Sequence, residues 1–576
     1  MTAVAAWSDL VVTALLLALA AVAALRRLTP PSPWRMVAVG AILGVLPVFG
    51  YWLAGRSSAN AVGGLIQWND AAIYLGCARS LVAGAPFEAT CAMRPYYTGF
   101  LGGLLMLAGG HVQAALLAQG AVAGAGTAWF AATIARREGM VAGLAVFAAL
   151  FVFASQFTMA ALTENAGLLL GSLALAVLWR RGRSVGAGEF FAAMAVLGLG
   201  LNARAGAMFV LPALLLWCFL ETEGSRRIRL WRTAAGAAGL AVSFVANGWL
   251  VGALGGGALS AHSNLAYNAY AMAVGGDRWP RILMDHPELA GMEAEKFAPI
   301  AYGLAWQAFL DRPYLLALGY AKGLVHWLYE IFRFVDFAPL RAVLAGLWGL
   351  GLLHCWTRRQ DDRIRLLAAM MAGTVMSSPF LTWFGGNRVF AVTHPADAIL
   401  VGLGAAWLAG RAGAIQPTTR GEGRPGPLAT ATALAVTVAA IIAVPVGKAW
   451  PLLQPVAAMP NCAEGERPVV AELGRETTAI RLTDGSPAAI WPPAFAAEDF
   501  VRLLDIWLYD RENLAALTPG TAMVQAMQRM PVDYGQTRRF LWDGPLPEAG
   551  LVAACLAPPR AGQWIDRATT LGPLGP

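Results

Sequence analysis

The sequence predicts an all-α polytopic membrane protein with about 12 transmembrane helices and a small extracytoplasmic α/β domain at the C-terminus. Three observations support this fold class. Of the 576 residues, 58% are apolar and only 13% are charged, whereas soluble proteins carry about 25% charged residues. Apolar runs long enough to cross a bilayer recur along the chain. Clusters of arginine lie between these runs, at every second connection.

The first apolar run, residues 8–25, predicts an extra N-terminal transmembrane helix within residues 1–35. No Lys or Arg precedes this run, and Arg26 and Arg27 follow it. A secretory signal peptide has the opposite order of charges. We therefore expect a retained helix whose N-terminus lies outside.

Residues 36–447 are expected to form the transmembrane core. The predicted spans are 36–54, 111–134, 139–157, 165–179, 188–203, 206–221, 233–253, 337–356, 366–384, 394–410 and 428–447. The two short runs around Arg204 suit a pair of broken helices at a functional break.

The arginine clusters assign the topology, because basic residues concentrate in cytoplasmic loops. The net charge of +8 is spread over these clusters and forms no single basic tract, which argues against nucleic-acid binding. The cytoplasmic set is Arg26, Arg27, Arg35, Arg136, Arg137, Arg180, Arg181, Arg183, Arg226, Arg227, Arg229, Arg232, Arg358, Arg359, Arg363, Arg365, Arg411, Arg420 and Arg424.

The opposite side then carries two long loops, at 55–110 and 254–336, a short turn at 158–164, and the tail 448–576. The tail has more ordinary polarity, mixes helix and strand signals, and is long enough for a small domain. The Gly/Pro/Arg-rich segment 410–427 is the expected linker on the cytoplasmic side.

The six cysteines also divide between the predicted outer segments and the predicted helices. Cys77 and Cys91 lie in the first outer loop, and Cys462 and Cys555 lie in the outer tail. Each pair forms a disulfide if the outer compartment is oxidising. The alternative is four unpaired small apolar residues, because sequence alone does not determine pairing. The remaining two cysteines, Cys218 and Cys355, fall inside predicted helices.

Four charged residues stand at the outer ends of predicted helices, where charges are costly and are candidates for function. They are Asp70, Glu164, Arg204 and Arg388, and His394 follows in the next turn. Carboxylates suit proton abstraction or the binding of a divalent metal. Arginine suits a phosphate group.

Each of these residues also has a purely structural interpretation. Asp70 can cap the helix that it begins, and Glu164 is favourable near a helix N-terminus. Arg204 and Arg388 can be interfacial arginines whose stems lie along apolar surface. His394 can be a packed polar residue. The four charged residues together are stronger evidence for a functional site than any one of them alone. The topology that places all four on one side was assigned from other arginines.

The motifs around these residues resemble those of the GT-C glycosyltransferases, the membrane class that contains protein O-mannosyltransferases and the aminoarabinose transferase of lipid A. The resemblance covers about residues 36–410 and depends on the order and sidedness of short motifs. They are "WNDAAIYLGCARSLVAGAPF", "MRPYYTGFLGGLLMLAGG", "TEN", "GLGLNARAG", "FLDRPYLLALGYAKGLVHWLYEIF" and "NRVFAVTHPADAILVGL".

The resemblance implies an enzyme that takes a sugar from a polyprenyl-phosphate donor and attaches it to a glycan, lipid or protein acceptor. It implies that Asp70 is the general base or orients the acceptor, that Glu164 supports the acceptor or a metal, and that Arg204 and Arg388 bind the donor phosphate. No residue is assigned to a metal, because Ala71 stands where the family often has a second acid; a divalent metal stays an open alternative.

Further substrate contacts are expected from polar and aromatic residues of the outer loops, because aromatic faces and short polar groups suit a sugar. An interfacial structural role is the alternative for each of them. The expected contacts are Asn69, Tyr74, Arg94, Tyr267, Tyr270, Asp277, Arg278 and His394.

The Arg-rich, Lys-poor and Ala-rich composition favours a bacterial inner membrane, with the site facing the periplasm. A membrane transporter or lipid flippase is the alternative function, because it also brings charges into a membrane cavity. Transporters usually show repeated halves and charges near the bilayer midplane, and neither is visible in this sequence. A non-catalytic envelope scaffold is a third alternative.

Overall fold

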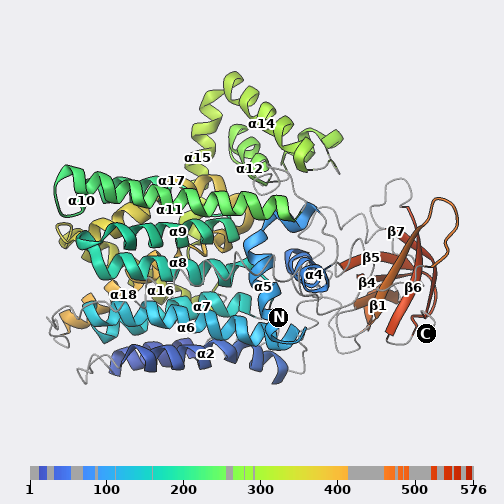
Figure 1. The fold of residues 1–576 in the computed structure, drawn as a ribbon, viewed down its shortest axis with the longest axis horizontal. Coiled ribbons are helices and arrows are strands. Elements are labelled where there is room, and N and C mark those ends of the chain that lie inside the picture. Colours follow the sequence, from blue (N-terminus) through green and yellow to red (C-terminus); the bar gives the residue numbers. More distant parts are fainter. Residues whose placement is uncertain are drawn as a thin grey trace.

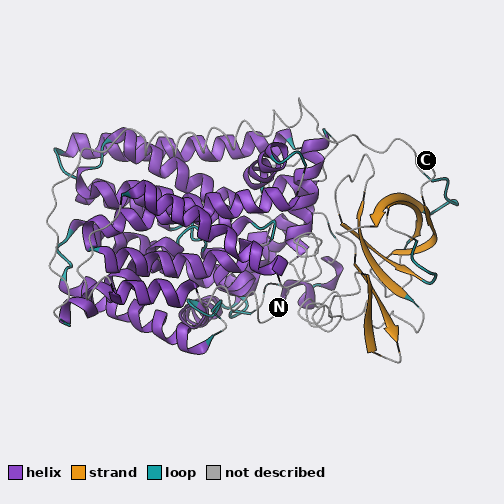
Figure 2. Cartoon of the chain, turned by 90° about the horizontal axis from the view of Figure 1, so that it is seen from below, coloured by secondary structure: helices purple, strands orange, loops and turns teal. Residues whose placement is uncertain are grey.

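The computed structural model contains a helical bundle and a smaller β-structure beyond one end of it (Figures 1 and 2). Residues whose structure is described are 12–22, 32–53, 69–84, 89–110, 112–158, 160–254, 264–277, 279, 281–289, 292, 294–335, 337–412, 460–473, 478–483, 486–491, 521–528, 537–547, 550–558 and 566–573. The predicted span 428–447, most of the predicted linker, and Arg278 lie outside the described residues.

Every predicted span from 36–54 to 394–410 corresponds to a helix, and these helices run side by side (Figure 1). Residues 12–22 of the first predicted span are helical as well. The bundle helices are α2 (Pro33–Leu53), α6 (Val112–Glu138), α7 (Met140–Thr158), α8 (Thr163–Arg181), α9 (Ala187–Ala203), α10 (Val210–Glu221), α11 (Arg226–Ala253), α16 (Ala338–Thr357), α17 (Asp362–Gly385) and α18 (His394–Arg411).

Within the described residues, five helical segments are long and apolar enough to cross a membrane. They are Ala114–Glu138, Met140–Thr158, Arg226–Ala253, Ala338–Thr357 and Asp362–Leu381. Several other apolar helices are shorter, α9 and α10 among them. The structure thus supports a membrane protein, while the count of about 12 spans stays a prediction.

Glycine contacts hold α2 against α6. Gly40 and Gly44 of α2 face Gly120 and Gly124 of α6, and a Cβ on Gly124 would lie 2.2 Å from the Gly40 carbonyl oxygen. Both helices carry glycines four residues apart, the spacing that lets helix backbones approach closely in membranes. This contact has a clear sequence signal, "GAILG" and "GAVAG".

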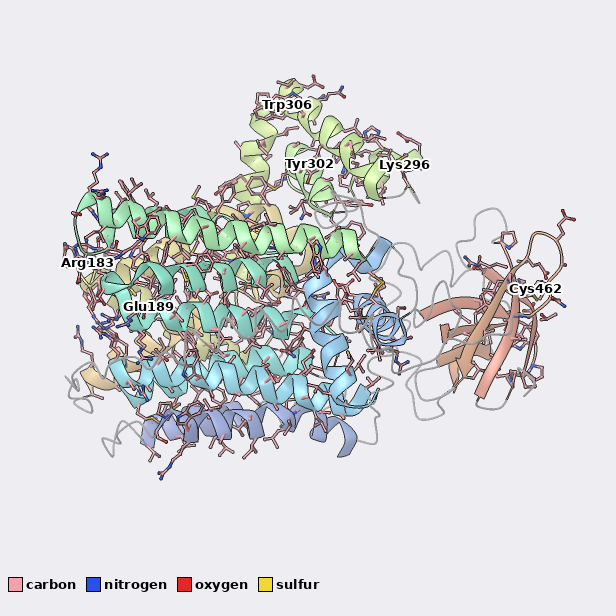
Figure 3. The ribbon with its side chains drawn as sticks, viewed as in Figure 1. Arg183, Glu189, Lys296, Tyr302, Trp306 and Cys462 are labelled. Atoms are coloured by element: carbon pink, nitrogen blue, oxygen red, sulfur yellow. A yellow bond between two sulfur atoms is a disulfide. The ribbon has the colours of Figure 1, made fainter. Side chains whose placement is uncertain are left out.

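One end of the bundle gathers the arginine-rich turns, as the loop pattern predicted. Arg358 pairs with Glu138 at 2.7 Å, and Arg365 pairs with Glu221 at 2.6 Å. The backbone N–H of Arg183 donates to the Asp362 carboxylate at 3.0 Å. These contacts join the turns after α6, α8, α10 and α16, and Figure 3 shows Arg183 at this end.

The two predicted outer loops contain short helices. The first loop forms α4 (Asn69–Ala83), the 3₁₀ helix η1 (Ala89–Met93) and α5 (Pro95–Leu107). The second forms α12 (Asn264–Ala273), α13 (Arg281–Asp285), η4 (Pro287–Leu289), α14 (Ala294–Asp311) and α15 (Pro313–Glu330). Two further 3₁₀ helices connect bundle helices, η2 (Gly182–Ser184) and η5 (Gly386–Phe390).

Helices α12 to α14 form a small packing unit at the side of the bundle (Figure 1). Its core contains Tyr270, Ile282 and Phe297. The outer face of α14 exposes Tyr302 and Trp306, four residues apart (Figure 3). Exposed aromatic residues of this kind are typical of membrane–water interfaces.

The described part of the tail is a seven-stranded sheet. Its strands are β1 (Arg467–Leu473), β2 (Thr478–Thr483), β3 (Ser486–Trp491), β4 (Ala522–Gln528), β5 (Thr537–Trp542), β6 (Gly550–Ala557) and β7 (Asp566–Pro573). They lie in the order β1-β6-β7-β5-β4-β2-β3, with β1 also paired to β4. The strands of the predicted α/β domain are therefore present, and its described residues contain no helix.

Both expected disulfides are present. Cys77 bonds to Cys91, and Cys462 bonds to Cys555, while Cys218 and Cys355 are free. The first disulfide joins α4 to η1, and the second joins β6 to the segment before β1.

Candidate functional site

Four charged residues from distant parts of the chain meet at the end of the bundle opposite the arginine-rich turns. Asp70 is the second residue of α4, and Glu164 is the second residue of α8. Arg204 follows the last residue of α9, and Arg388 lies in η5. The carboxylates thus occupy the first turns of their helices, where the helix dipole favours negative charge. We call Asp70, Glu164, Arg204 and Arg388 the charged cluster.

Arg388 bridges the two carboxylates of the charged cluster. Its Nε donates to Glu164 Oε1 at 2.5 Å, and its Nη2 donates to Asp70 Oδ2 at 3.0 Å. Arg204 Nη2 lies 3.5 Å from the same oxygen of Glu164. Glu164 is therefore the centre of the cluster, held between two guanidinium groups. The four residues predicted from separate motifs are brought together.

Burial separates the roles of the two carboxylates. The Glu164 side chain is 0% exposed, whereas 35% of the Asp70 side chain is exposed. A buried carboxylate is stable only when it is paired and hydrogen-bonded. Glu164 therefore orders the two arginines, and Asp70 is the carboxylate that a reactant can reach.

Arg204 retains binding capacity. It is buried, and its Nε has no hydrogen-bond partner among the described residues. A guanidinium group carries five N–H donors in one plane, and here only one nitrogen lies near a carboxylate. The remaining donors suit an anion with several oxygens, such as a phosphate.

Glycines of α8 and of the segment after α9 position the chain that carries Arg388. A Cβ on Gly171 would lie 1.9 Å from the Val392 carbonyl oxygen, and one on Gly206 would lie 2.6 Å from that of Val389. Only residues without a side chain allow this approach. The glycines in "GLLLGS" and "NARAG" thus set the position of Arg388, a role that sequence analysis did not assign.

Helix α4 is held in place by covalent and aromatic contacts. The Cys77–Cys91 disulfide fixes it to η1, and Tyr74 packs edge-on against Tyr97, with ring centroids 5.4 Å apart. The Tyr97 hydroxyl donates to Gln119 Oε1 at 2.9 Å. Sequence analysis missed Tyr97 and Gln119, although a glutamine inside an apolar run was a usable signal.

Tyr74 lies within the electrostatic range of the charged cluster. Burial raises the pKa of Tyr74 to about 12, and the Asp70 carboxylate acts in the same direction. The phenol therefore stays neutral at physiological pH and keeps its proton. The positive charges of Arg94 and Arg204 oppose this shift.

Arg94 directly precedes α5. It is 5% exposed, and its Nη1 donates to the Met93 carbonyl oxygen at 2.7 Å. Its positive charge acts on Tyr74 together with that of Arg204.

His394 is packed among aromatic rings, as its structural interpretation expects, and its contact with substrate stays a prediction. Its ring stacks on Phe153 at a centroid distance of 4.5 Å and meets the edge of Phe334 at 5.4 Å. Its Nδ1 lies 3.7 Å from Asp397 Oδ2. The histidine is thus held between aromatic rings at the start of α18.

The outer-stretch residues are placed in the α12–α14 unit and contribute to its packing. Tyr267 stacks on Phe297 with centroids 4.2 Å apart. The Tyr270 hydroxyl donates to Asp285 at 3.0 Å, and Asp277 accepts from a neighbouring arginine. Asn69 is the first residue of α4; its side chain and Arg278 lie outside the described part of the chain.

The residues present do not fit a metal at this site. Arg388 hydrogen-bonds to both carboxylates, so their oxygens already have cationic partners. The group of possible ligands found among the described residues is Cys462, Glu466 and Cys555, and its two cysteines are bonded to each other. We therefore derive no metal-dependent step.

Comparison with known proteins adds no family assignment. No protein-family model matches the chain, and no curated protein matches it significantly.

Proposed function

We propose that the protein is a glycosyltransferase that moves a sugar from a polyprenyl-phosphate donor to an envelope acceptor on the periplasmic face of a bacterial inner membrane. The observation that carries the proposal is the charged cluster: a partly exposed carboxylate beside two buried guanidinium groups. The resemblance to GT-C enzymes agrees with this arrangement, and the acceptor is a glycan, a lipid or a protein.

The phosphate of the donor would bind between Arg204 and Arg388. It would replace Asp70 at Arg388 Nη2, because the phosphodiester of the donor also carries a negative charge and its oxygens can accept hydrogen bonds from Arg204 and Arg388 together. Binding of the donor would therefore release Asp70 to act as a base.

The transfer step then needs three movements of electrons and protons. The acceptor oxygen forms a bond to the anomeric carbon, and Asp70 takes the acceptor proton. The bond between the anomeric carbon and the phosphate oxygen breaks, and the electron pair leaves with the lipid phosphate. Arg204 and Arg388 stabilise the charge on that leaving group.

The membrane and the disulfides support the proposed location. A polyprenyl chain can lie against the apolar bundle helices while its phosphate stops at the charged cluster. Both disulfides belong to elements at this end of the protein, whereas Cys355 is free and lies three residues before Arg358 at the other end. Oxidised pairs on one side and free thiols on the other suit an oxidising outer compartment.

The test compares envelope glycans and lipids by mass spectrometry in cells with and without the gene. Deletion should remove a sugar mass increment from one fraction, and the wild-type gene should restore it. Asp70→Asn should not restore it, although the variant should reach the membrane at the wild-type level. Asp311→Asn, at the end of α14 and outside the cluster, is the matched control and should restore it.

Two results would contradict the proposal. Full restoration by Asp70→Asn would exclude Asp70 as the base. A change in the compartment of a lipid or sugar, with no change in its covalent structure, would instead support a transporter or flippase.

A further inference from the structure

Helix α11 carries an exposed apolar stripe along most of its length. Trp231 and Trp249 are 68% and 56% exposed, and Val242 and Val245 between them are exposed as well. The two tryptophans are 18 residues apart in the sequence, which is about five full turns of an α-helix, so they lie on the same face. This face is apolar from one tryptophan to the other and suits contact with lipid.

The two tryptophans have the spacing of the two boundaries of a bilayer. At about 1.5 Å per residue they lie about 27 Å apart along the helix, close to the thickness of about 30 Å of the hydrocarbon core. Tryptophan concentrates at both membrane–water interfaces. Trp231 lies near the start of α11, at the arginine-rich end of the bundle, and Trp249 lies near its other end. The residues before Trp231 are therefore expected at the level of the lipid headgroups.

Two exposed arginines stand at this level. Helix α11 begins with Arg226 and Arg227, and no acidic residue lies in its first turn. Both side chains are exposed, and neither has a hydrogen-bond or ion-pair partner among the described residues. Because the helix dipole disfavours cations at an N-terminus, these two charges do not serve the stability of α11. They suit an anion supplied from outside the chain.

The next two arginines of the same segment have structural roles instead. Arg229 Nη1 donates to the Leu220 carbonyl oxygen at 3.0 Å, and Arg232 Nη1 donates to that of Glu223 at 2.6 Å. Leu220 belongs to the last turn of α10, and Glu223 follows that helix. These bonds hold α10 and α11 together, so the segment divides into two arginines that bind the protein and two that face outward.

Apolar side chains surround the outward arginines. Ile228 and Leu230 of α11 are exposed, and so are Leu216 and Leu220 of the neighbouring helix α10 (Figure 1). A soluble anion would leave these side chains in water, whereas the acyl chains of a phospholipid would cover them. Guanidinium groups at headgroup level, an interfacial tryptophan and an apolar surface beyond it match the parts of one phospholipid molecule.

We propose that the start of α11 binds an anionic glycerophospholipid of the leaflet at the arginine-rich end of the bundle. Arg226 and Arg227 would bind its phosphate, and its acyl chains would follow the apolar stripe from Trp231 toward Trp249. An anionic lipid fits better than a zwitterionic one, because the charge of its phosphate is not neutralised within the headgroup. The site lies at the end opposite the charged cluster and does not depend on the proposed function.

The experiment titrates the full-length protein in detergent with dioleoylphosphatidylglycerol or dioleoylphosphatidylcholine and measures the first bound lipid by native mass spectrometry. We expect phosphatidylglycerol to bind about fivefold more tightly, the factor that one basic residue near a membrane surface supplies. The variant Arg226→Gln/Arg227→Gln should lose this preference. The control variant Arg312→Gln/Arg333→Gln removes two exposed arginines outside the patch and should keep it.

Hydrogen–deuterium exchange in lipid nanodiscs gives an independent readout. Exchange of 226–231 should be slower in phosphatidylglycerol than in phosphatidylcholine, and Arg226→Gln/Arg227→Gln should remove the difference. Glycerol 3-phosphate, the soluble part of the headgroup, should not compete with the lipid, because it cannot cover the apolar stripe. If the double variant melts at a lower temperature without lipid, the exchange of the wild-type protein in the two lipids still decides.

Equal affinity of the wild-type protein for the two lipids, or an unchanged preference in Arg226→Gln/Arg227→Gln, would overturn the inference. Competition by glycerol 3-phosphate would overturn it as well, because the arginines would then bind a soluble anion. None of these results bears on the transferase proposal, which is tested separately by Asp70→Asn.

Discussion

Replacing Arg388 by alanine removes the residue that joins both carboxylates of the charged cluster. Two charge-assisted hydrogen bonds are lost, one to Glu164 at 2.5 Å and one to Asp70 at 3.0 Å. Breaking one partner of a buried ion pair costs about 3 to 5 kcal/mol, because the remaining charge stays buried.

The structure divides this cost unequally. Glu164 is fully buried and would keep Arg204, 3.5 Å away, as its charged partner, together with the Thr163 hydroxyl at 3.4 Å. Asp70 is partly exposed, so water replaces much of its lost bond. We therefore expect Arg388→Ala to lower the free energy of unfolding by about 3 kcal/mol and Asp70→Asn to lower it by about 1 kcal/mol or less.

The assay is reversible unfolding of the purified protein in detergent, applied to Glu164→Gln, Arg388→Met and the double variant. The double variant removes the buried Glu164–Arg388 pair as a whole, and the loss of the Glu164–Arg204 contact is common to it and to Glu164→Gln. It should therefore recover about 2 kcal/mol relative to the sum of the single effects. Strict additivity of the two substitutions, or equal stability of Arg388→Ala and Asp70→Asn, would refute the bridging role of Arg388.

Three further outcomes are expected. Replacing Cys77 and Cys91 together by alanine should destabilise the first outer loop by about 3 kcal/mol, since the disulfide closes a loop of about 15 residues. Proteolysis of the loop should become faster and sugar transfer slower, and wild-type rates of both would contradict the prediction. Gly124→Val should separate α2 from α6 and lower the melting temperature in detergent, whereas Gly349→Ala, with open space around its Cα, should not; equal effects would refute the glycine contact. Hydrogen bonding to a neighbouring arginine lowers the pKa of Asp285 below its ordinary value of 3.8. The ionised carboxylate therefore stabilises the fold above about pH 4, and this stabilisation is lost as the pH falls through the lowered pKa; because the side chain is largely exposed, it amounts to less than about 1 kcal/mol. Hydrogen exchange in 264–289, corrected for intrinsic rates, should lose this acid dependence in Asp285→Asn.

The helices of the bundle could be predicted because they depend on local composition. A run of about 20 apolar residues must satisfy its own backbone in a bilayer, and a helix does this without help from distant residues. Helices α6, α7 and α11 therefore lie close to the predicted spans 111–134, 139–157 and 233–253. The arginine clusters also predicted which turns lie together, as the Arg358–Glu138 pair shows.

The strands of the tail illustrate the opposite case. Mixed helix and strand signals in 448–576 did not show that β1 pairs with both β4 and β6. β1 and β6 pair across about 80 residues of chain. Strand pairing depends on contacts between distant segments, and composition does not specify the partner.

The charged cluster lies between these cases. The sequence by itself determined which charges stand at the outer helix ends, because a charge near a membrane is costly and therefore conspicuous. It also determined that Asp70, Glu164, Arg204 and Arg388 share one side. Only the tertiary structure decided that Arg388 bridges both acids, that Glu164 is buried while Asp70 is partly exposed, and that His394 packs between aromatic rings. These differences arise from distances and burial, which are set by the packing of α4, α8 and η5 against one another rather than by any one of them.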